Sequence, residues 1–130
     1  MTDTIKTSVR IKSNTSSFAA KVAPFGKLVL TAGINHHLAN SPERVSAELT
    51  ACFNRHVLGD WGDVSKEDAK QNDWVVKNKN GRLLSSYKLS TGQKIWIITS
   101  GYGTPKSAMD LETYSEADYT NTVIMFPSEY

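Results

Sequence analysis

The chain has 130 residues, of which 39% are hydrophobic and 22% are charged, and its net charge is +2 at neutral pH. This length and composition are typical of one globular, soluble domain. No apolar run approaches the ~20 residues of a membrane-spanning helix, and the N-terminus lacks the apolar core of a secretory signal. The single cysteine, Cys52, cannot form an intramolecular disulfide. These features favour a cytoplasmic protein.

Residues 1–23 are polar and show no sustained hydrophobic periodicity, which predicts a flexible N-terminal arm. The arm is more basic than acidic, so one interpretation is that it binds DNA through its phosphates. A solvated tail rich in serine and threonine explains the same composition. Residues 24–130 are then predicted to form the folded domain.

The domain is predicted to begin with a strand over residues 27–33, followed by a turn or a single helical turn over residues 34–41. Ser41 is a good N-cap for a helix that has Pro42 at its first position and ends at Gly59. The residues of its apolar face recur at i, i+4, i+7 and i+11, and these are Val45, Leu49, Cys52 and His56.

A second helix is predicted to begin after Ser65, which with Asp68 approximates a capping box, and to end at the "NG" of residues 80–81. The apolar face expected for it consists of Ala69, Trp74, Val75 and Val76. "RLLSSYKL" and "KIWIIT" are two strands joined by a hairpin, and "TNTVIMFP" is the last strand. The order of strand, two helices and three-strand meander predicts a single α+β domain. Its helices are expected to pack on one face of a mainly antiparallel sheet.

Three stretches, "GDWGDVSKEDAKQND", "GRLLSSYKLSTGQKIWIIT" and "TVIMFPSEY", resemble a group of small uncharacterised "plasmid-related" proteins of bacterial plasmids and mobile elements. The resemblance covers about residues 26–100 and 120–130. The connection over residues 101–119 departs from it and is expected to be much shorter in most relatives. The group has no established catalytic residues, so the resemblance implies an origin, a mobile-element accessory protein in a bacterial cytoplasm, and no site.

The segment "RHVLGDWGDVSKED", residues 55–68, connects the two predicted helices. Its length is ordinary for a helix–helix connection, so we expect a structural corner in which Trp61 folds back as an apolar plug. Two alternatives remain open. Asp60, Asp63 and Asp68 could hold a calcium or magnesium ion, although their spacing is not that of an EF-hand. Trp61 could instead be exposed and bind a partner.

A small ribonuclease-like enzyme is a second interpretation of the whole chain. His36 and His37 could serve as general base and acid, because histidine titrates near neutral pH. Arg82 and Lys88 could then stabilise developing negative charge. This interpretation depends on analogy with the layout of compact ribonucleases. The other histidine and the cysteine, His56 and Cys52, are expected to be packing residues.

The leading hypothesis is a non-enzymatic accessory protein that binds a host or plasmid macromolecule, with a protein partner favoured over nucleic acid. Besides Trp61, candidate binding residues lie in the loop after the hairpin, and they are Tyr102, Tyr114 and Tyr119. The sequence indicates no cofactor and no metal site. DNA binding by the basic arm and ribonuclease activity remain the alternatives.

Overall fold

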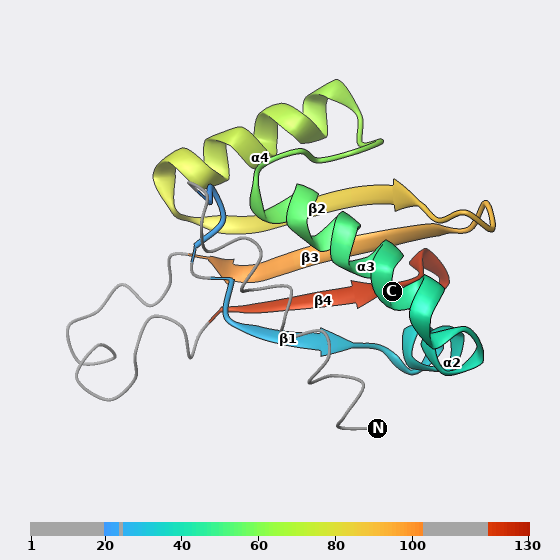
Figure 1. Ribbon diagram of the computed structural model, residues 1–130. Helices are drawn as coiled ribbons and strands as arrows, with labels where there is room; N and C mark the ends of the chain where they lie inside the picture. Colours follow the sequence, from blue (N-terminus) through green and yellow to red (C-terminus); the bar gives the residue numbers. More distant parts are fainter. Residues whose placement is uncertain (1–19, 24, 103–119) are drawn as a thin grey trace, which may run out of the picture.

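The protein folds as a single α+β domain with three helices and a four-stranded sheet among the residues that the structure describes (Figure 1). The structure is a computed structural model, and it describes residues 20–23, 25–102 and 120–130, without the side chain of Tyr102. The elements are β1 (Lys27–Leu30), α2 (Ala32–Asn40), α3 (Pro42–Val57), α4 (Lys66–Asn78), β2 (Gly81–Lys88), β3 (Lys94–Tyr102), β4 (Asn121–Met125) and the 3-10 turn η1 (Pro127–Glu129). No described helix is long and apolar enough to cross a membrane.

The sheet has the strand order β1-β4-β3-β2, which confirms the predicted meander of the last three strands. β2 pairs antiparallel with β3, and β3 pairs antiparallel with β4. β1 joins the sheet as a parallel neighbour of β4, with Leu30 opposite Ile124. The predicted mainly antiparallel sheet is therefore confirmed, with one parallel pair added between its most distant strands in sequence.

The segment predicted to be a turn over residues 34–41 is the helix α2, and the first strand ends at Leu30 instead of Gly33. Thr31 is the N-cap, and its Oγ1 accepts a hydrogen bond from the Ile34 amide. The Glu129 carboxylate, from the other end of the chain, accepts hydrogen bonds from the Gly33 amide (2.9 Å) and from Thr31 Oγ1 (2.6 Å). This long-range carboxylate satisfies one of the free amides at the positive end of α2. A side chain on Gly33 would collide with it, because a Cβ there would lie 2.8 Å from the carboxylate.

Helix α3 crosses one face of the sheet (Figure 1) and confirms the predicted apolar face, since all four of its predicted residues are buried. Ser41 precedes the helix as predicted but makes no side-chain capping bond. Gly59 follows the helix with φ +86°, a conformation that glycine adopts without strain. The main apolar core joins α2 and α3 to the sheet, and it includes Ile34, Leu49, Phe53, Tyr87, Ile97 and Ile124.

Helix α4 lies beside the edge strand β2 (Figure 1), so the two predicted helices meet the sheet differently. Its N-cap is confirmed, because Ser65 Oγ accepts a hydrogen bond from the Asp68 amide at 3.1 Å. Its apolar face is narrower than predicted. Val75 is buried in a second apolar cluster, whereas Trp74 is 50% exposed.

Val22, which precedes the predicted domain boundary at residue 24, packs against the described domain. Val22 is fully buried in the second apolar cluster, and its backbone amide donates to the Val57 carbonyl at 3.1 Å. Residues 1–19 of the predicted arm lie outside the described residues, and so do residues 103–119.

Candidate functional site

Trp61, one of the predicted binding residues, is a buried plug in the corner between α3 and α4. Its side chain is only 6% exposed, and its Nε1 donates to Asp73 Oδ1 at 3.0 Å. Its ring meets the His56 ring in a T-shaped contact, with 5.8 Å between the ring centroids. The expected packing of Trp61 as an apolar plug is therefore confirmed, and its indole has too little exposed surface to anchor a partner in this conformation.

The same corner covers the outer edge of β2. Gly62 forms a parallel bridge with Ser86, in which Ser86 N donates to the Trp61 carbonyl and Asp63 N donates to the Ser86 carbonyl. A Cβ on Gly62 would lie 2.1 Å from the Ser86 carbonyl oxygen, so this close approach requires glycine. Since an exposed strand edge invites pairing with other chains, the corner closes a surface that would otherwise aggregate.

The amide side chain of Asn72 completes the cover on the same strand. Its Nδ2 donates to the Leu84 carbonyl at 2.8 Å, and its Oδ1 accepts from the Leu84 amide at 3.2 Å. The side chain thus imitates the backbone of a neighbouring strand, which explains why a polar residue is buried on α4. The segment over residues 55–68 and α4 together close the β2 edge.

The three aspartates of the corner make different hydrogen bonds, and the Asp60 carboxylate is held within the protein. Asp60 accepts from Arg55 Nε at 2.7 Å and from the Gly62 amide at 3.2 Å. The hydrogen bond from Arg55 holds the pKa of Asp60 below its usual value. The Asp63 amide donates to the Ser86 carbonyl of β2, and the Asp68 amide donates to Ser65 Oγ at the start of α4. Within the described ranges, no three His, Cys, Asp or Glu side chains gather as a group that could hold a metal ion.

His56 lies at the centre of a buried hydrogen-bond chain beneath α3. Its Nδ1 is 2.6 Å from Ser85 Oγ, and its Nε2 is 2.9 Å from Thr99 Oγ1. Thr99 Oγ1 is 2.7 Å from Thr122 Oγ1, which donates to the Phe25 carbonyl. The chain therefore connects α3 to three strands and to the segment before β1.

The Phe25 carbonyl at the end of this hydrogen-bond chain can only accept, and this determines where every proton in the hydrogen-bond chain lies. Thr122 must donate to the carbonyl, so Thr99 donates to Thr122, and His56 Nε2–H donates to Thr99. His56 Nδ1 is then an acceptor, and Ser85 is its donor. Burial lowers the pKa of His56 to about 3, so the ring is neutral at physiological pH. His56 is a packing residue, as the sequence predicts, with both nitrogens occupied.

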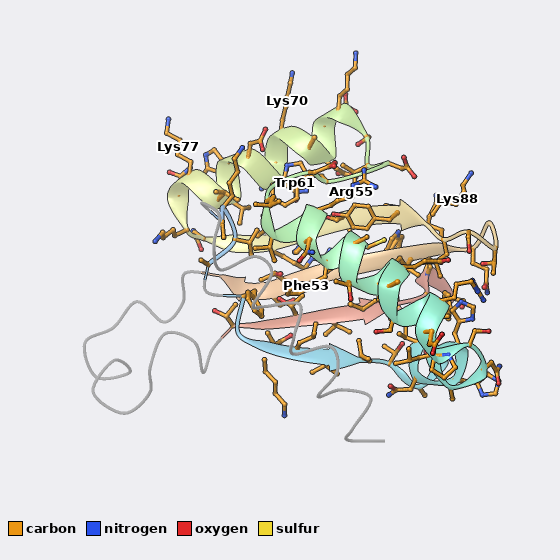
Figure 2. The ribbon with its side chains drawn as sticks, viewed as in Figure 1. Phe53, Arg55, Trp61, Lys70, Lys77 and Lys88 are labelled. Atoms are coloured by element: carbon orange, nitrogen blue, oxygen red, sulfur yellow. The ribbon has the colours of Figure 1, made fainter. Side chains whose placement is uncertain are left out.

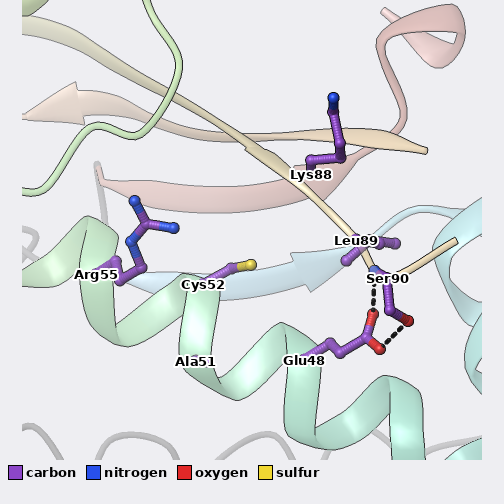
Figure 3. Close-up of a pocket in the computed structure, with 7 residues that line it drawn as sticks. All are labelled: Glu48, Ala51, Cys52, Arg55, Lys88, Leu89 and Ser90. Carbon is purple, nitrogen blue, oxygen red and sulfur yellow. Dashed lines mark hydrogen bonds between the residues drawn. The ribbon is translucent and has the colours of Figure 1, made fainter. Parts of the chain in front are cut away.

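A hollow of about 250 Å³ lies between α3 and the end of β2 (Figure 3). Its polar groups hold the β2–β3 turn against α3. Glu48 accepts hydrogen bonds from the amide and the hydroxyl of Ser90, and these bonds lower the pKa of its carboxyl. Burial raises the pKa of the Cys52 thiol to about 11, which keeps the thiol protonated and weakly nucleophilic. The lining is therefore mainly structural, and the Lys88 side chain points away from α3 (Figure 3).

The four residues of the ribonuclease hypothesis do not form one cluster. His36 is exposed on α2, and His37 is partly buried with its ring 6.0 Å from that of Phe126. Arg82 and Lys88 stand near the two ends of β2, about 20 Å apart along the extended strand. Arg82 donates to the Tyr130 hydroxyl at 2.5 Å. The arrangement therefore supplies no shared site for an acid, a base and two cations.

The predicted tyrosine surface falls largely outside the described residues. Tyr102 ends β3, but its side chain is not described, and Tyr114 and Tyr119 lie within residues 103–119. The binding role of these three tyrosines remains a prediction.

The sheet has two faces, which alternate residue by residue along each strand. The first face supplies the sheet residues of both apolar clusters, among them Leu30, Leu83, Tyr87, Ile97 and Ile124. The second face carries the intervening side chains. A row of apolar residues crosses it through registered pairs, and this row is Leu84, Ile98, Val123 and Val29. No second-face residue belongs to either apolar cluster of the described chain.

An aromatic and cationic cluster lies on the second face. The rings of Trp96 and Tyr130 form a T-shaped pair with 5.7 Å between their centroids. The Arg82 guanidinium lies 5.6 Å from the centre of the Tyr130 ring, and Tyr130 is 69% exposed. Glu129 anchors this end of the chain, because its carboxylate also accepts from the Phe126 amide at 2.9 Å. An exposed aromatic ring is thus held in place between a guanidinium and an indole.

The charge on the strands has one sign. The four strands contain Lys27, Arg82, Lys88 and Lys94 and no aspartate or glutamate. Lys27, Lys88 and Lys94 make no ion pair within the described structure. By register, all three lysines belong to the second face. This face was not predicted from the sequence, although "KIWIIT" contains Lys94 and Trp96 and the ending "SEY" contains Tyr130.

Comparison of the chain with protein-family models, with curated proteins and with solved structures finds no significant match.

Proposed function

We propose that the chain is a non-enzymatic accessory protein of bacterial plasmids or other mobile elements, and that it binds a macromolecule in the cytoplasm through the second face of its sheet. The origin rests on the sequence resemblance, and the binding surface rests on the geometry. The observation that carries the proposal is the cluster of Trp96, Tyr130 and Arg82 on a sheet whose strands contain cations and no acids.

Three properties support this surface over the others. Tryptophan, tyrosine and arginine are the side chains that most often dominate binding energy. In the apolar row beside them Val29 is 37% exposed and Leu84 and Val123 are partly buried, so a partner would exclude water from these side chains. Tyr130 is fixed by its contacts with Trp96 and Arg82, so little conformational entropy is lost when a partner covers it.

The test is affinity purification of the tagged full-length chain from its native host, with nucleic acid retained and all bound material identified. Trp96→Ala removes an indole from the second face, and Trp74→Ala removes a half-exposed indole from α4 as the matched control. We expect Trp96→Ala to lose the bound macromolecule and Trp74→Ala to keep it. Thermal unfolding of both variants checks that they fold. Loss with Trp74→Ala alone, or no bound macromolecule above a mock purification, contradicts the proposal.

A further inference from the structure

We infer that the ligand of the second face is a single-stranded nucleic acid, an inference that rests on the proposed function and names its partner class. The sequence alone favours a protein partner. Three features of the second face point instead to an unpaired nucleic acid strand: its charge, its aromatic rings and its shape.

The charge of the second face complements a polyanion. Lys27, Lys88 and Lys94 lie around the apolar row, with Lys27 on one edge strand and Lys88 on the other. Lysine is depleted in protein–protein interfaces, whereas lysines that neutralise phosphates supply much of the affinity for nucleic acids. Since the strands carry no carboxylate, nothing on them repels a phosphate backbone.

The aromatic rings offer stacking surfaces for bases. In the T-shaped contact of Trp96 with Tyr130, one ring uses only its edge, so both of its faces stay out of that contact. Arg82 lies over the Tyr130 ring and can contribute both a charge and a stacking plane. Unpaired bases stack on such rings whatever their sequence, because every base has a π-face.

The shape of the face favours a single strand over a duplex. From Lys94 to Ser100 the face is about 20 Å long, and across four strands it is about 14 Å wide. A broad sheet cannot enter a duplex groove, which admits a helix or a two-stranded ribbon. A four-stranded sheet with exposed aromatics accommodates about two or three splayed bases.

The experiment measures binding of the purified full-length chain to fluorescent 12-nucleotide probes by anisotropy, at several salt concentrations. The probes are a mixed-sequence single strand of DNA, the same strand of RNA and the corresponding DNA duplex. We expect both single strands to bind more tightly than the duplex, with an affinity that falls steeply as salt rises.

Two matched triple variants separate the effect of the second-face lysines on binding from the effect of the net charge of the protein. K27Q/K88Q/K94Q removes the lysines of the second face, and K66Q/K70Q/K77Q removes three lysines from α4, where Lys70 and Lys77 extend into solvent (Figure 2). Both lower the net charge equally. We expect the first to weaken binding at least tenfold and to reduce the slope of log affinity against log salt by about 2, since each phosphate contact with a single strand contributes about 0.7. The α4 variant should retain most of the affinity and slope.

Stacking is tested by Tyr130→Leu and Tyr130→Phe. Leucine removes the ring, so binding should fall about tenfold, whereas phenylalanine keeps the ring and should preserve most of the affinity. Equal effects of the two triple variants, equal binding of duplex and single strand, or an unaffected Tyr130→Leu would overturn the inference. If no probe binds but Trp96→Ala still loses a protein partner from cells, the nucleic-acid inference fails while the proposed binding function stands.

Discussion

The two faces of the sheet are built from alternate residues of the same four strands, yet they differ in almost every physical respect. The first face is covered by α3 and has a closed polar network around His56. The second face has cations, an exposed tyrosine ring and an apolar row that joins neither buried cluster. One face supplies both described apolar clusters, and the other carries the binding surface proposed above.

The largest expected contrast between the faces is at two consecutive isoleucines of β3. Ile97 is fully buried in the main core, so Ile97→Ala should lower the free energy of unfolding by about 4 kcal/mol. Ile98 is 5% exposed but lies on the second face outside both clusters. Ile98→Ala should cost no more than about half as much, because Ile98 packs in neither apolar cluster of the described chain. Urea unfolding of both variants measures the difference, and equal losses would show that the second face is also a packed core.

Trp61 and Trp74 provide a second contrast, between the covered edge of β2 and the exposed side of α4. Trp61→Ala should destabilise the protein by about 3 kcal/mol or more, because it leaves a cavity beside His56 and Val75. Trp74→Ala should change stability by less than about 0.5 kcal/mol, as expected for an exposed position. Chemical unfolding monitored by circular dichroism checks both. A stable Trp61→Ala variant would disprove the plug.

The buried histidine should make the first face sensitive to acid. The pKa of His56 is about 3 in the folded protein, against about 6.5 when the chain unfolds, so below pH 6.5 the unfolded state binds the extra proton. The contribution of the neutral His56 to the free energy of unfolding is therefore fully present above pH 6.5, and it falls as the pH drops toward 3. Between pH 7 and pH 5 the expected loss is about 2 kcal/mol.

Urea unfolding at pH 7, 6 and 5 measures this loss in the wild type and in His56→Gln, which cannot titrate there. His36→Gln, on the exposed side of α2, is the matched control and should keep the wild-type pH dependence. A pH profile of His56→Gln that matches the wild type would exclude the buried histidine as its source.

A smaller loss of stability is expected at the β2–β3 turn, where Glu48 accepts hydrogen bonds from Ser90. Glu48→Gln removes the charge that accepts hydrogen bonds from Ser90, so stability at pH 7 should fall by about 1 kcal/mol or less. The lowered pKa of Glu48 means that its contribution is present above the ordinary glutamate pKa and is lost as the pH falls through the folded value. Hydrogen exchange of the Ser90 amide should accelerate in this variant, and an unchanged rate would contradict the role of this hydrogen bond.

The last prediction concerns the ribonuclease alternative, for which we expect no RNA cleavage above background. Since Arg82 and Lys88 lie far apart on β2, the purified protein should cleave RNA no faster than a mock purification, with or without magnesium. His36→Ala and His37→Ala should leave that background unchanged. Robust cleavage that both substitutions abolish would restore the enzyme hypothesis, because acid–base catalysis typically contributes about 10²–10⁴-fold.

Local patterns in the sequence determined much of the architecture. The repeat that buries Val45, Leu49 and Cys52, the cap at Ser65 and the glycine after α3 each depend on residues within a few turns of one another. These signals give the fold class, the meander and the ends of two helices. They also placed His56 on an inner face, although its proton positions depend on the carbonyl of Phe25.

Only the tertiary structure decided features that join distant parts of the chain. The first turn of α2 is held by a carboxylate 96 residues from the Gly33 amide, and β1 pairs with β4, the strand most distant from it in sequence. Trp61 and Trp74 each follow an aspartate in the sequence, yet Trp61 is buried and Trp74 is half exposed. Trp61 lies in the corner between α3 and α4, where it contacts Asp73 of α4 and His56 of α3. The second face of the sheet is likewise defined only by the tertiary structure. Alternation along a strand defines two faces, but which one is covered depends on where the helices pack.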